Sequence, residues 1–241
     1  MAADGARELF LQPVASHNPF EETFAQLARA IRLGAVAVGD KFPPERELGE
    51  RLGVSRTTVR EAIRGLEQAG YITTRRGRYG GTFVVRDTVK APPRARTRAL
   101  GPELGEALDF RMALEPGAAG LAAGKAANAQ IEQMRALTSA MESTGTAQFV
   151  RGNCRLHILI AQAAGCDPVL RTVTTLEVQV MDALLAVPKL DSSMSHSHRQ
   201  HHAIIDAIAA GDRRGARDAM EEHLAASDVL MRELASSRRR R

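Results

Sequence analysis

The chain has 241 residues and a formal net charge of +5, and 44% of its residues are hydrophobic while only 4% are aromatic. This length predicts two modest domains, with cores rich in Ala and Leu that favour helices. No apolar run reaches the roughly 20 residues that span a bilayer, and the N-terminus MAADGARELF lacks a signal-peptide pattern, so we expect no membrane segment.

Positive charge is concentrated in the first part of the chain. Residues 1–98 hold 17 Lys and Arg against 11 Asp and Glu, whereas residues 99–241 hold 16 against 17. Because phosphate attracts positive charge, a nucleic-acid surface is expected in the first part only. The two cysteines, Cys154 and Cys166, are too few for a disulfide framework and favour a reducing cytoplasm.

The first elements along the chain are an arm and a helix. Residues 1–19 lack a hydrophobic period and are expected to form a flexible arm. From Phe20, an apolar stripe at helical spacing predicts a helix that ends at Gly34. Residues 20–86 together are predicted to form one small domain.

Residues 43–64, PPERELGERLGVSRTTVREAIR, predict two helices joined by a tight turn. Leu48 and Leu52 share one face of the first helix, Gly53 ends it, and Ser55 is a good N-cap for the second. This end of the second helix enters the major groove when a helix-turn-helix binds DNA, where Arg bonds guanine and Thr contacts a phosphate or a base. The alternative is a helical hairpin with a solvated polar face. The outward-facing residues are Arg56, Thr57, Thr58 and Arg60.

A short hairpin is predicted directly after these helices. Residues 71–74 and 82–85 have the composition of strands, and the segment 75–81 between them, RRGRYGG, is basic and rich in glycine. Glycine lets a backbone approach DNA closely, and arginine supplies attraction to the phosphates. A wing of this kind favours the DNA-binding interpretation over the plain helical hairpin.

The rest of the chain is predicted to be helical. Residues 87–102, DTVKAPPRARTRALGP, have the composition of a linker, and residues 236–241 form a basic tail. Between them, residues 103–235 show six or seven apolar stripes at helical spacing. Residues 103–128 are expected to form one or two helices, with Pro116 and Gly117 as the place of a kink and Leu121 on the inward side. We therefore expect a mainly α protein, with three helices and a two-stranded wing followed by an antiparallel helical bundle.

Four polar residues of this bundle are predicted to converge on a metal ion. His201 lies ten residues before Gly211 and His223 lies twelve after it, so each is about 15 Å from the turn if two helices fold back there. Asn153 and His157 are four apart and share a face of another helix. Such donors on facing helices are a common way to build a metal site in a bundle. The alternative is that each histidine is an ordinary core or surface residue.

Residues 20–86 resemble the winged helix-turn-helix of the GntR family of bacterial regulators, through the stretch PPERELGERLGVSRTTVREAIRGLEQAGYI. The resemblance implies DNA contacts from the arginine of the second helix, from the start of the third helix and from the wing. The bulky Tyr79 departs from the small residues usual in the wing. The implied DNA-binding residues are Arg46, Ser55, Arg56, Thr57, Thr58, Arg60, Gly77 and Arg78.

Residues 103–235 resemble the all-helical ligand-binding domain of the FadR subfamily, through ALDFRMALEPGAAGLAA, RLHILIAQAAGCDPVL and QHHAIIDAIAAGDRRGARDAMEEHL. Many members bind a divalent metal through Asp-x-x-x-His and two later histidines, near a pocket for a small carboxylate. His157, His201 and His223 match these histidines, but Asn153 stands in place of the Asp. An uncharged ligand set favours Zn or Ni over Mg or Ca. Cys154 could substitute as a ligand, or could simply be a small buried residue.

Arg111 has two interpretations. The resemblance implies that the arginine of the R-x-x-x-E stretch binds the carboxylate of an effector, for which a planar guanidinium is suited. The alternative is an ion pair with Glu115, one helical turn away.

The sequence therefore predicts a homodimeric, cytoplasmic transcriptional regulator, most simply a repressor. Each subunit would bind one half of a palindromic operator, and a small organic acid in the helical domain, with or without a metal, would change the DNA affinity through a coupling free energy. Two other classes stay open. One is a metal-dependent hydrolase whose histidines activate water, for which no general base stands at an obvious spacing. The other is a nonspecific architectural DNA binder, which the basic linker and the terminal arginines would suit.

Overall fold

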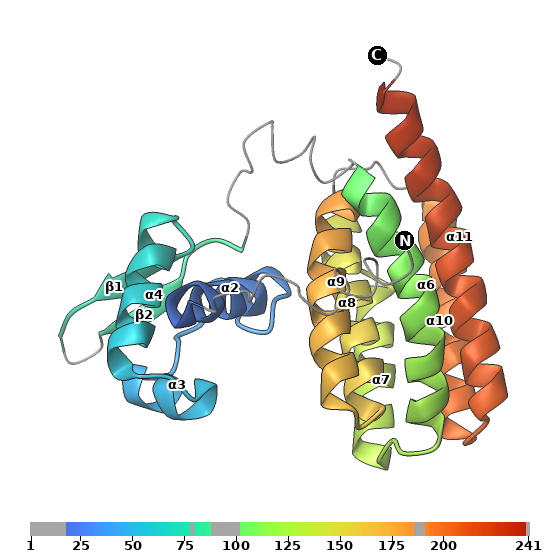
Figure 1. Cartoon of the computed structure of the whole chain (residues 1–241), viewed down its shortest axis with the longest axis horizontal. Helices are drawn as coiled ribbons and strands as arrows, with labels where there is room; N and C mark the ends of the chain where they lie inside the picture. The colour runs from blue at the N-terminus through green and yellow to red at the C-terminus, as the bar shows by residue number, and fades with distance from the viewer. Residues whose placement is uncertain (1–17, 78–79, 88–101, 186–190, 240–241) are drawn as a thin grey trace, which may run out of the picture. The chain divides into compact units, whose positions relative to one another are not determined.

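The structure is a computed structural model that describes residues 18–77, 80–87, 102–185 and 191–239. The chain divides into two compact units, Met1–Val89 and Lys90–Arg241 (Figure 1). Nearly all of the predicted arm and linker lies outside the described residues. None of the helices in the described ranges is long and apolar enough to cross a membrane.

Over residues 18–77 and 80–87, the first unit contains three helices and a two-stranded antiparallel sheet, which confirms the predicted winged helix-turn-helix. In the sheet, Ile72 pairs with Val84 and Thr74 pairs with Thr82. β1 starts one residue later than predicted because the N–H of Tyr71 still bonds the carbonyl oxygen of Leu66, at the end of the preceding helix. The elements are α2 (Pro19–Arg32), α3 (Glu45–Leu52), α4 (Arg56–Gln68), β1 (Ile72–Arg75) and β2 (Gly81–Val84).

Local signals in the sequence explain where these helices begin and end. The side chain of Asn18 accepts a hydrogen bond from the N–H of Phe20 and caps α2, and Ser55 accepts one from the N–H of Thr58 and caps α4. Gly53 ends α3 with a φ of 66°, in the left-handed region that glycine adopts without strain. The turn between α3 and α4 is therefore fixed by the residues that predicted it.

One aliphatic core holds this unit together. It is formed by the inward stripes of the three helices and by one residue from each strand. Alternation along β1 and β2 directs Ile72 and Val84 into this core, so the hairpin is anchored at the end nearest the helices. The main buried residues are Leu27, Ile31, Leu48, Val59, Ile63, Leu66, Ile72 and Val84.

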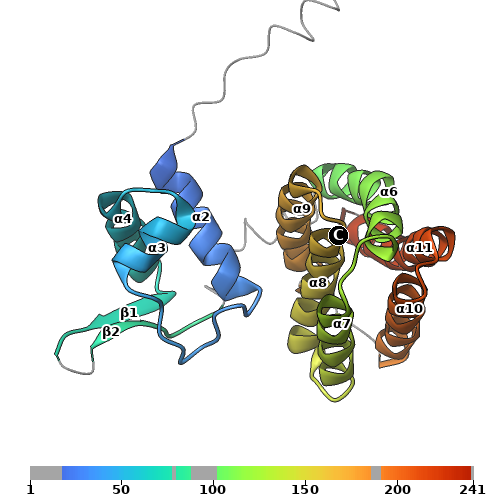
Figure 2. The ribbon, with the colours of Figure 1, turned by 90° about the horizontal axis from the view of Figure 1, so that it is seen from below.

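In its described residues, the second unit is a bundle of six helices, the lower of the two predicted numbers. Around the bundle, α6 packs on α11, α11 on α10, α10 on α7, α7 on α8, α8 on α9 and α9 on α6 (Figure 2). α6 also touches α8 and α10, so it is the most central helix. The helices are α6 (Pro102–Ala123), α7 (Asn128–Met141), α8 (Thr146–Ala163), α9 (Asp167–Leu185), α10 (Asp191–Ala209) and α11 (Arg213–Arg239).

α6 continues through Pro116 as one helix, because packing against four other helices offsets the hydrogen bond that proline cannot make. Two other local details of the bundle differ from the sequence-based expectations. Leu121 was expected inside but is 39% exposed, since the alanines around it, including Ala119 and Ala122, form the buried face instead. α11 extends to Arg239 rather than to about Ala235.

Replacing Leu66 by Ala should destabilise the first unit by about 2–5 kcal/mol, because a fully buried side chain would leave a cavity. Urea denaturation followed by far-UV circular dichroism measures this loss. The control is Val38→Ala, since Val38 is 54% exposed and should change the free energy of unfolding by less than about 0.5 kcal/mol. Equal losses in both variants would contradict the assignment of Leu66 to the core.

Candidate nucleic-acid interface and candidate metal centre

The start of α4 carries the residues predicted to meet DNA. Arg56, Thr57 and Arg60 are exposed, and Thr58 is half-buried. The Ser55 hydroxyl lies 2.8 Å from that of Thr58 and also caps the helix, so it is committed to this turn. The first turn of α4 therefore presents a guanidinium and hydroxyl groups to solvent, together with the free N–H groups of a helix N-terminus that attract phosphate.

Two of the predicted DNA-binding arginines form ion pairs within the unit. Arg60 donates from Nη2 to Glu45 Oε2 at 2.9 Å and from Nε to both carboxylate oxygens at 3.2 Å, which joins α4 to α3. These hydrogen bonds from Arg60 lower the pKa of Glu45. Arg46 donates to Glu50 at 3.1 Å along α3. Glu45, which no pattern in the sequence singled out, orients the guanidinium of Arg60.

The loop of the wing is held at Gly80 by a lysine that no pattern in the sequence singled out. Lys41 donates from Nζ to the carbonyl oxygen of Gly80 at 2.6 Å. Two cations approach the Phe83 ring, with Lys41 Nζ at 5.9 Å and Arg75 Cζ at 5.3 Å from its centroid. Gly77 is exposed with a φ of 107°, which favours glycine there. Arg78 lies outside the described residues.

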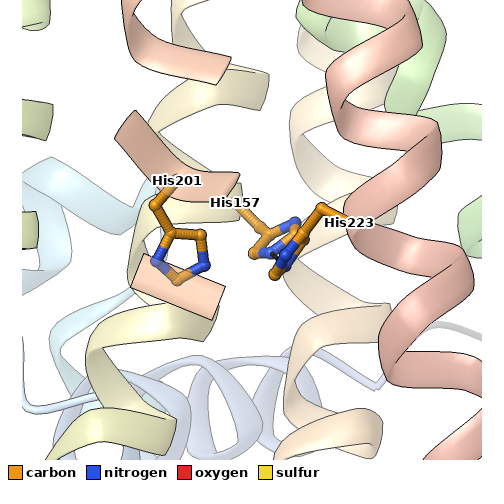
Figure 3. A group of neighbouring side chains, drawn as sticks. All are labelled: His157, His201 and His223. Atoms are coloured by element: carbon orange, nitrogen blue, oxygen red, sulfur yellow. Dashed lines mark hydrogen bonds between the residues drawn. The ribbon is translucent and has the colours of Figure 1, made fainter. Parts of the chain in front are cut away.

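In the second unit, the four residues predicted as metal ligands come together inside the bundle. Figure 3 shows the imidazoles of His157, His201 and His223, which come from α8, α10 and α11. One ligand atom from each of the three lies within 4.8 Å of the others. Asn153 joins the group, because its Oδ1 lies 3.0 Å from His201 Nε2. All four residues are buried.

The helical hairpin explains this convergence. α10 and α11 reverse direction at Gly211, whose φ of 71° permits the turn, and they then pack side by side. His201 and His223 are therefore level across the hairpin, with ring centroids 4.7 Å apart. Their near-equal separation from Gly211 in the sequence is the signal that predicted this contact.

Two outer hydrogen bonds orient the imidazoles. His157 Nδ1 lies 2.5 Å from Glu115 Oε2, and His223 Nδ1 lies 3.1 Å from Gln200 Oε1. An ionised carboxylate and an amide oxygen can only accept, so each Nδ1 carries its proton and donates it. The Nε2 atoms of His157 and His223 then carry lone pairs, and they face each other at 3.2 Å.

This arrangement fits a metal ion chemically. Two buried lone pairs repel at such a distance unless a proton or a cation lies between them. Nitrogen and oxygen donors that share a zinc ion at about 2.1 Å lie roughly 3.0–3.4 Å apart. The His157–His223 and His201–Asn153 contacts, at 3.2 Å and 3.0 Å, match that spacing. His201 Nε2 donates to the Asn153 oxygen here, so ligation by this nitrogen requires its proton to move to Nδ1.

Behind the histidines lies a buried cluster of charges around Arg111. Its Nε donates to Glu115 Oε1 at 2.8 Å, so the ion pair that the sequence offered as one alternative is present. Arg111 Nη2 also lies 2.8 Å from Glu177 Oε1, a contact between charges without hydrogen-bond alignment. The same Nη2 is 3.4 Å from His157 Nδ1, farther than the Glu115 oxygen that receives the imidazole proton. Glu177 on α9 was not expected from the sequence.

Burial and charge act differently on these two carboxyl groups. Burial alone would raise the pKa of Glu115, but Arg111 and His157 outweigh it and lower this pKa to about 2. For Glu177, burial outweighs the attraction of Arg111 and raises the pKa above its usual value. Glu115 is therefore the carboxyl group that Arg111 and His157 hold most firmly in its ionised form.

Cys154 is fully buried, and its thiol lowers the pKa of Glu177, against the larger effect of burial. In the described ranges, the groups of side chains with metal-binding geometry are His157, His201, His223 and Glu115, His157, Glu177, and Cys154 belongs to neither. Arg111 already sits as the resident cation between the two carboxylates of the second group. The histidine group is the one that suits a metal.

Replacing Arg111 by Met should destabilise the bundle by about 3–5 kcal/mol, because Glu115 would be left buried without its cation. Urea denaturation at neutral pH measures the change. The control is Glu132→Gln, which breaks the exposed Arg135–Glu132 pair of 3.0 Å and should cost less than about 1 kcal/mol. A stable Arg111→Met variant would show that this ion pair is not needed for the fold.

Comparison with known proteins agrees with both units. Residues 19–84 match the family described as bacterial regulatory proteins, gntR family, and residues 106–226 match the FCD domain. A relative from Escherichia coli (strain K12), provisionally named as the L-lactate dehydrogenase operon regulatory protein, is 33% identical over 80% of this chain and 79% of its own. The HTH-type transcriptional repressor NanR of Enterobacter sp. (strain 638) is 29% identical over 90% and 87% of the two chains.

Solved structures share the fold at lower identity. McbR/YncC from E. coli aligns with a TM-score of 0.55 and 18% identity, over 90% of this chain and 99% of its own. A GntR regulator from Rhodococcus sp. RHA1 aligns with a TM-score of 0.51 and 17% identity, over 88% and 96%. Relatives of this kind are transcriptional regulators and not enzymes, which removes the hydrolase alternative. The chain belongs to the gntR family of bacterial regulatory proteins, as a DNA-binding transcriptional regulator with an FCD domain.

Proposed function

We propose that this regulator is a cytoplasmic, homodimeric repressor that binds a palindromic operator and is controlled by a small organic acid together with a divalent metal. The observation that carries the metal part is the buried pair of imidazole lone pairs, with His157 Nε2 and His223 Nε2 3.2 Å apart. The repressor part is supported by relatives named as repressors.

The proposed ligands are Asn153, His157, His201 and His223. Three imidazoles and an amide oxygen carry no charge, so nitrogen-preferring Zn or Ni suits them better than Mg or Ca. When bound, the metal would supply the positive charge that attracts the carboxylate of an effector. The protein would hold this ion in a buried and pre-oriented ring of donors.

Arg111 is the proposed contact for the effector carboxylate within the protein. Its hold on Glu115 is a hydrogen-bonded ion pair, whereas its contact with Glu177 lacks hydrogen-bond alignment. A stronger anion can therefore compete for Arg111 against Glu177 rather than against Glu115. The name of the E. coli relative refers to an L-lactate dehydrogenase operon. This name supports a small hydroxy or keto acid as the class of effector.

Binding of the effector would have to favour one arrangement of the bundle over another in order to alter DNA affinity. α8, α9, α10 and α11 all contribute groups around the site, and each packs on at least two other helices. A ligand that pulls these groups together changes the relative free energies of the two arrangements, and DNA binding changes by the same coupling free energy.

Purified protein should contain one equivalent of zinc or nickel per chain, and a chelator should lower its melting temperature. A metal present at 100 times its dissociation constant stabilises the folded state by about 2.7 kcal/mol. Elemental analysis and thermal melts before and after chelation test this. His223→Ala should lose the metal, whereas His202→Ala, at the exposed neighbour of His201, should retain it. Metal-free protein that gains no stability from added Zn or Ni would refute the site.

Replacing Arg56 by Ala should weaken operator binding by about 1–3 kcal/mol and relax specificity at one base pair if this side chain bonds a base. Arg64→Ala is the matched control, because Arg64 is exposed on α4 two turns beyond the docking end. Titrations of operator and random DNA over a range of salt concentrations measure both effects. An equal loss on all sequences with a smaller salt slope would make Arg56 a phosphate contact. No preference for the operator even in the unmodified protein would support the architectural alternative.

A further inference from the structure

In the proposed metal site, the Nδ1 atoms of His157 and His223 are hydrogen-bonded to two different kinds of group. His157 Nδ1 donates to the carboxylate of Glu115 on α6, and His223 Nδ1 donates to the amide oxygen of Gln200 on α10. All four residues are buried, so water does not compete for these hydrogen bonds. The two contacts have the same geometric effect, since each fixes the proton on Nδ1 and leaves a lone pair on Nε2.

The two outer partners differ in charge. An amide oxygen accepts a proton without carrying charge, whereas an ionised carboxylate makes the imidazole a stronger electron donor at its other nitrogen. The Nε2 of His157 is therefore the more electron-rich of these two donor atoms.

Glu115 is fixed in its ionised form by a chain of contacts that crosses three helices. One carboxylate oxygen receives Arg111 Nε at 2.8 Å, and the other receives His157 Nδ1. Arg111 is in turn held against Glu177 on α9. Each Glu115 oxygen thus accepts a hydrogen bond from its own donor. An amide nitrogen in place of either oxygen would point its N–H groups at the N–H of Arg111 or of His157.

We propose that Glu115 is a positioning residue which supplies, through the His157 ring, the negative charge that Asn153 does not bring to the metal site. This inference rests on the proposed function, because it assigns a role within the same metal centre. The negative charge would then lie on Glu115, the hydrogen-bond partner of the ligand His157, and not on a ligand itself. Metal affinity then depends on Glu115 although this side chain does not touch the ion.

The first test compares Glu115→Gln with Glu222→Gln in zinc competition against a chromophoric chelator. Glutamine keeps the size of Glu115 but has one acceptor oxygen for two donors, so we expect zinc affinity to fall about 10- to 100-fold. Glu222 is exposed and adjacent to His223, so its variant removes the same charge near the site without touching His157, and its affinity should stay within about threefold.

The second test moves the charge to the other imidazole. Gln200→Glu places a carboxylate behind His223, and the double variant E115Q/Q200E should regain at least about tenfold of the zinc affinity that Glu115→Gln loses. A purely structural role for Glu115 predicts no such recovery. Melting temperatures of the metal-free variants show whether each one is folded.

A third measurement tests the proposal even if the Gln200→Glu variant does not fold. Nitrogen-15 spectra of the imidazoles report which ring nitrogen carries the proton, and His157 should change from Nδ1–H in the unmodified protein to a mixed or Nε2–H form in Glu115→Gln. Unmodified protein that binds no zinc would refute the metal centre itself. Zinc binding that is unchanged in Glu115→Gln, with the His157 proton still on Nδ1, would overturn only the role of Glu115.

Discussion

The ion pair between Arg111 and Glu115, together with Glu177, is the constraint on which the second unit depends. Charges buried this deeply are tolerated only when they are paired, so α6, α8 and α9 are held at the one spacing that keeps the pairs closed. The histidines lie directly against this cluster. The fold of the bundle and the orientation of the donor atoms therefore share one set of contacts.

The first unit uses a similar device at its surface. Glu45 on α3 forms an ion pair with Arg60 on α4, and Lys41 donates a hydrogen bond to Gly80 in the loop of the wing. These contacts are exposed and contribute little to stability. Their effect is to limit the conformations of cationic groups before DNA arrives, which lowers the entropy that binding would otherwise cost. Both units thus combine an aliphatic scaffold with charged side chains aimed by opposite charges.

Comparison of sequence and structure shows how far local patterns reach. The stretch 43–64 specified its own turn, because Gly53 and Ser55 encode a helix end and a helix start within three residues. The hairpin of α10 and α11 followed from Gly211, and with it the level positions of His201 and His223. Helix ends were less certain, since α11 runs to Arg239 where the local pattern suggested an end near Ala235.

The sequence by itself determined the winged helix-turn-helix, the helical class of the second unit and the four candidate metal donors, because each follows from spacing along one helix or across one turn. Only the tertiary structure decided which residues form hydrogen bonds with the outer nitrogens of those donors. Glu115 lies 42 residues from His157 along the chain, and Gln200 lies 23 from His223. Helical periodicity predicts which face of a helix is buried but not which helix it meets, and so the partners of Arg111, His157 and His223 emerged only when six helices packed together.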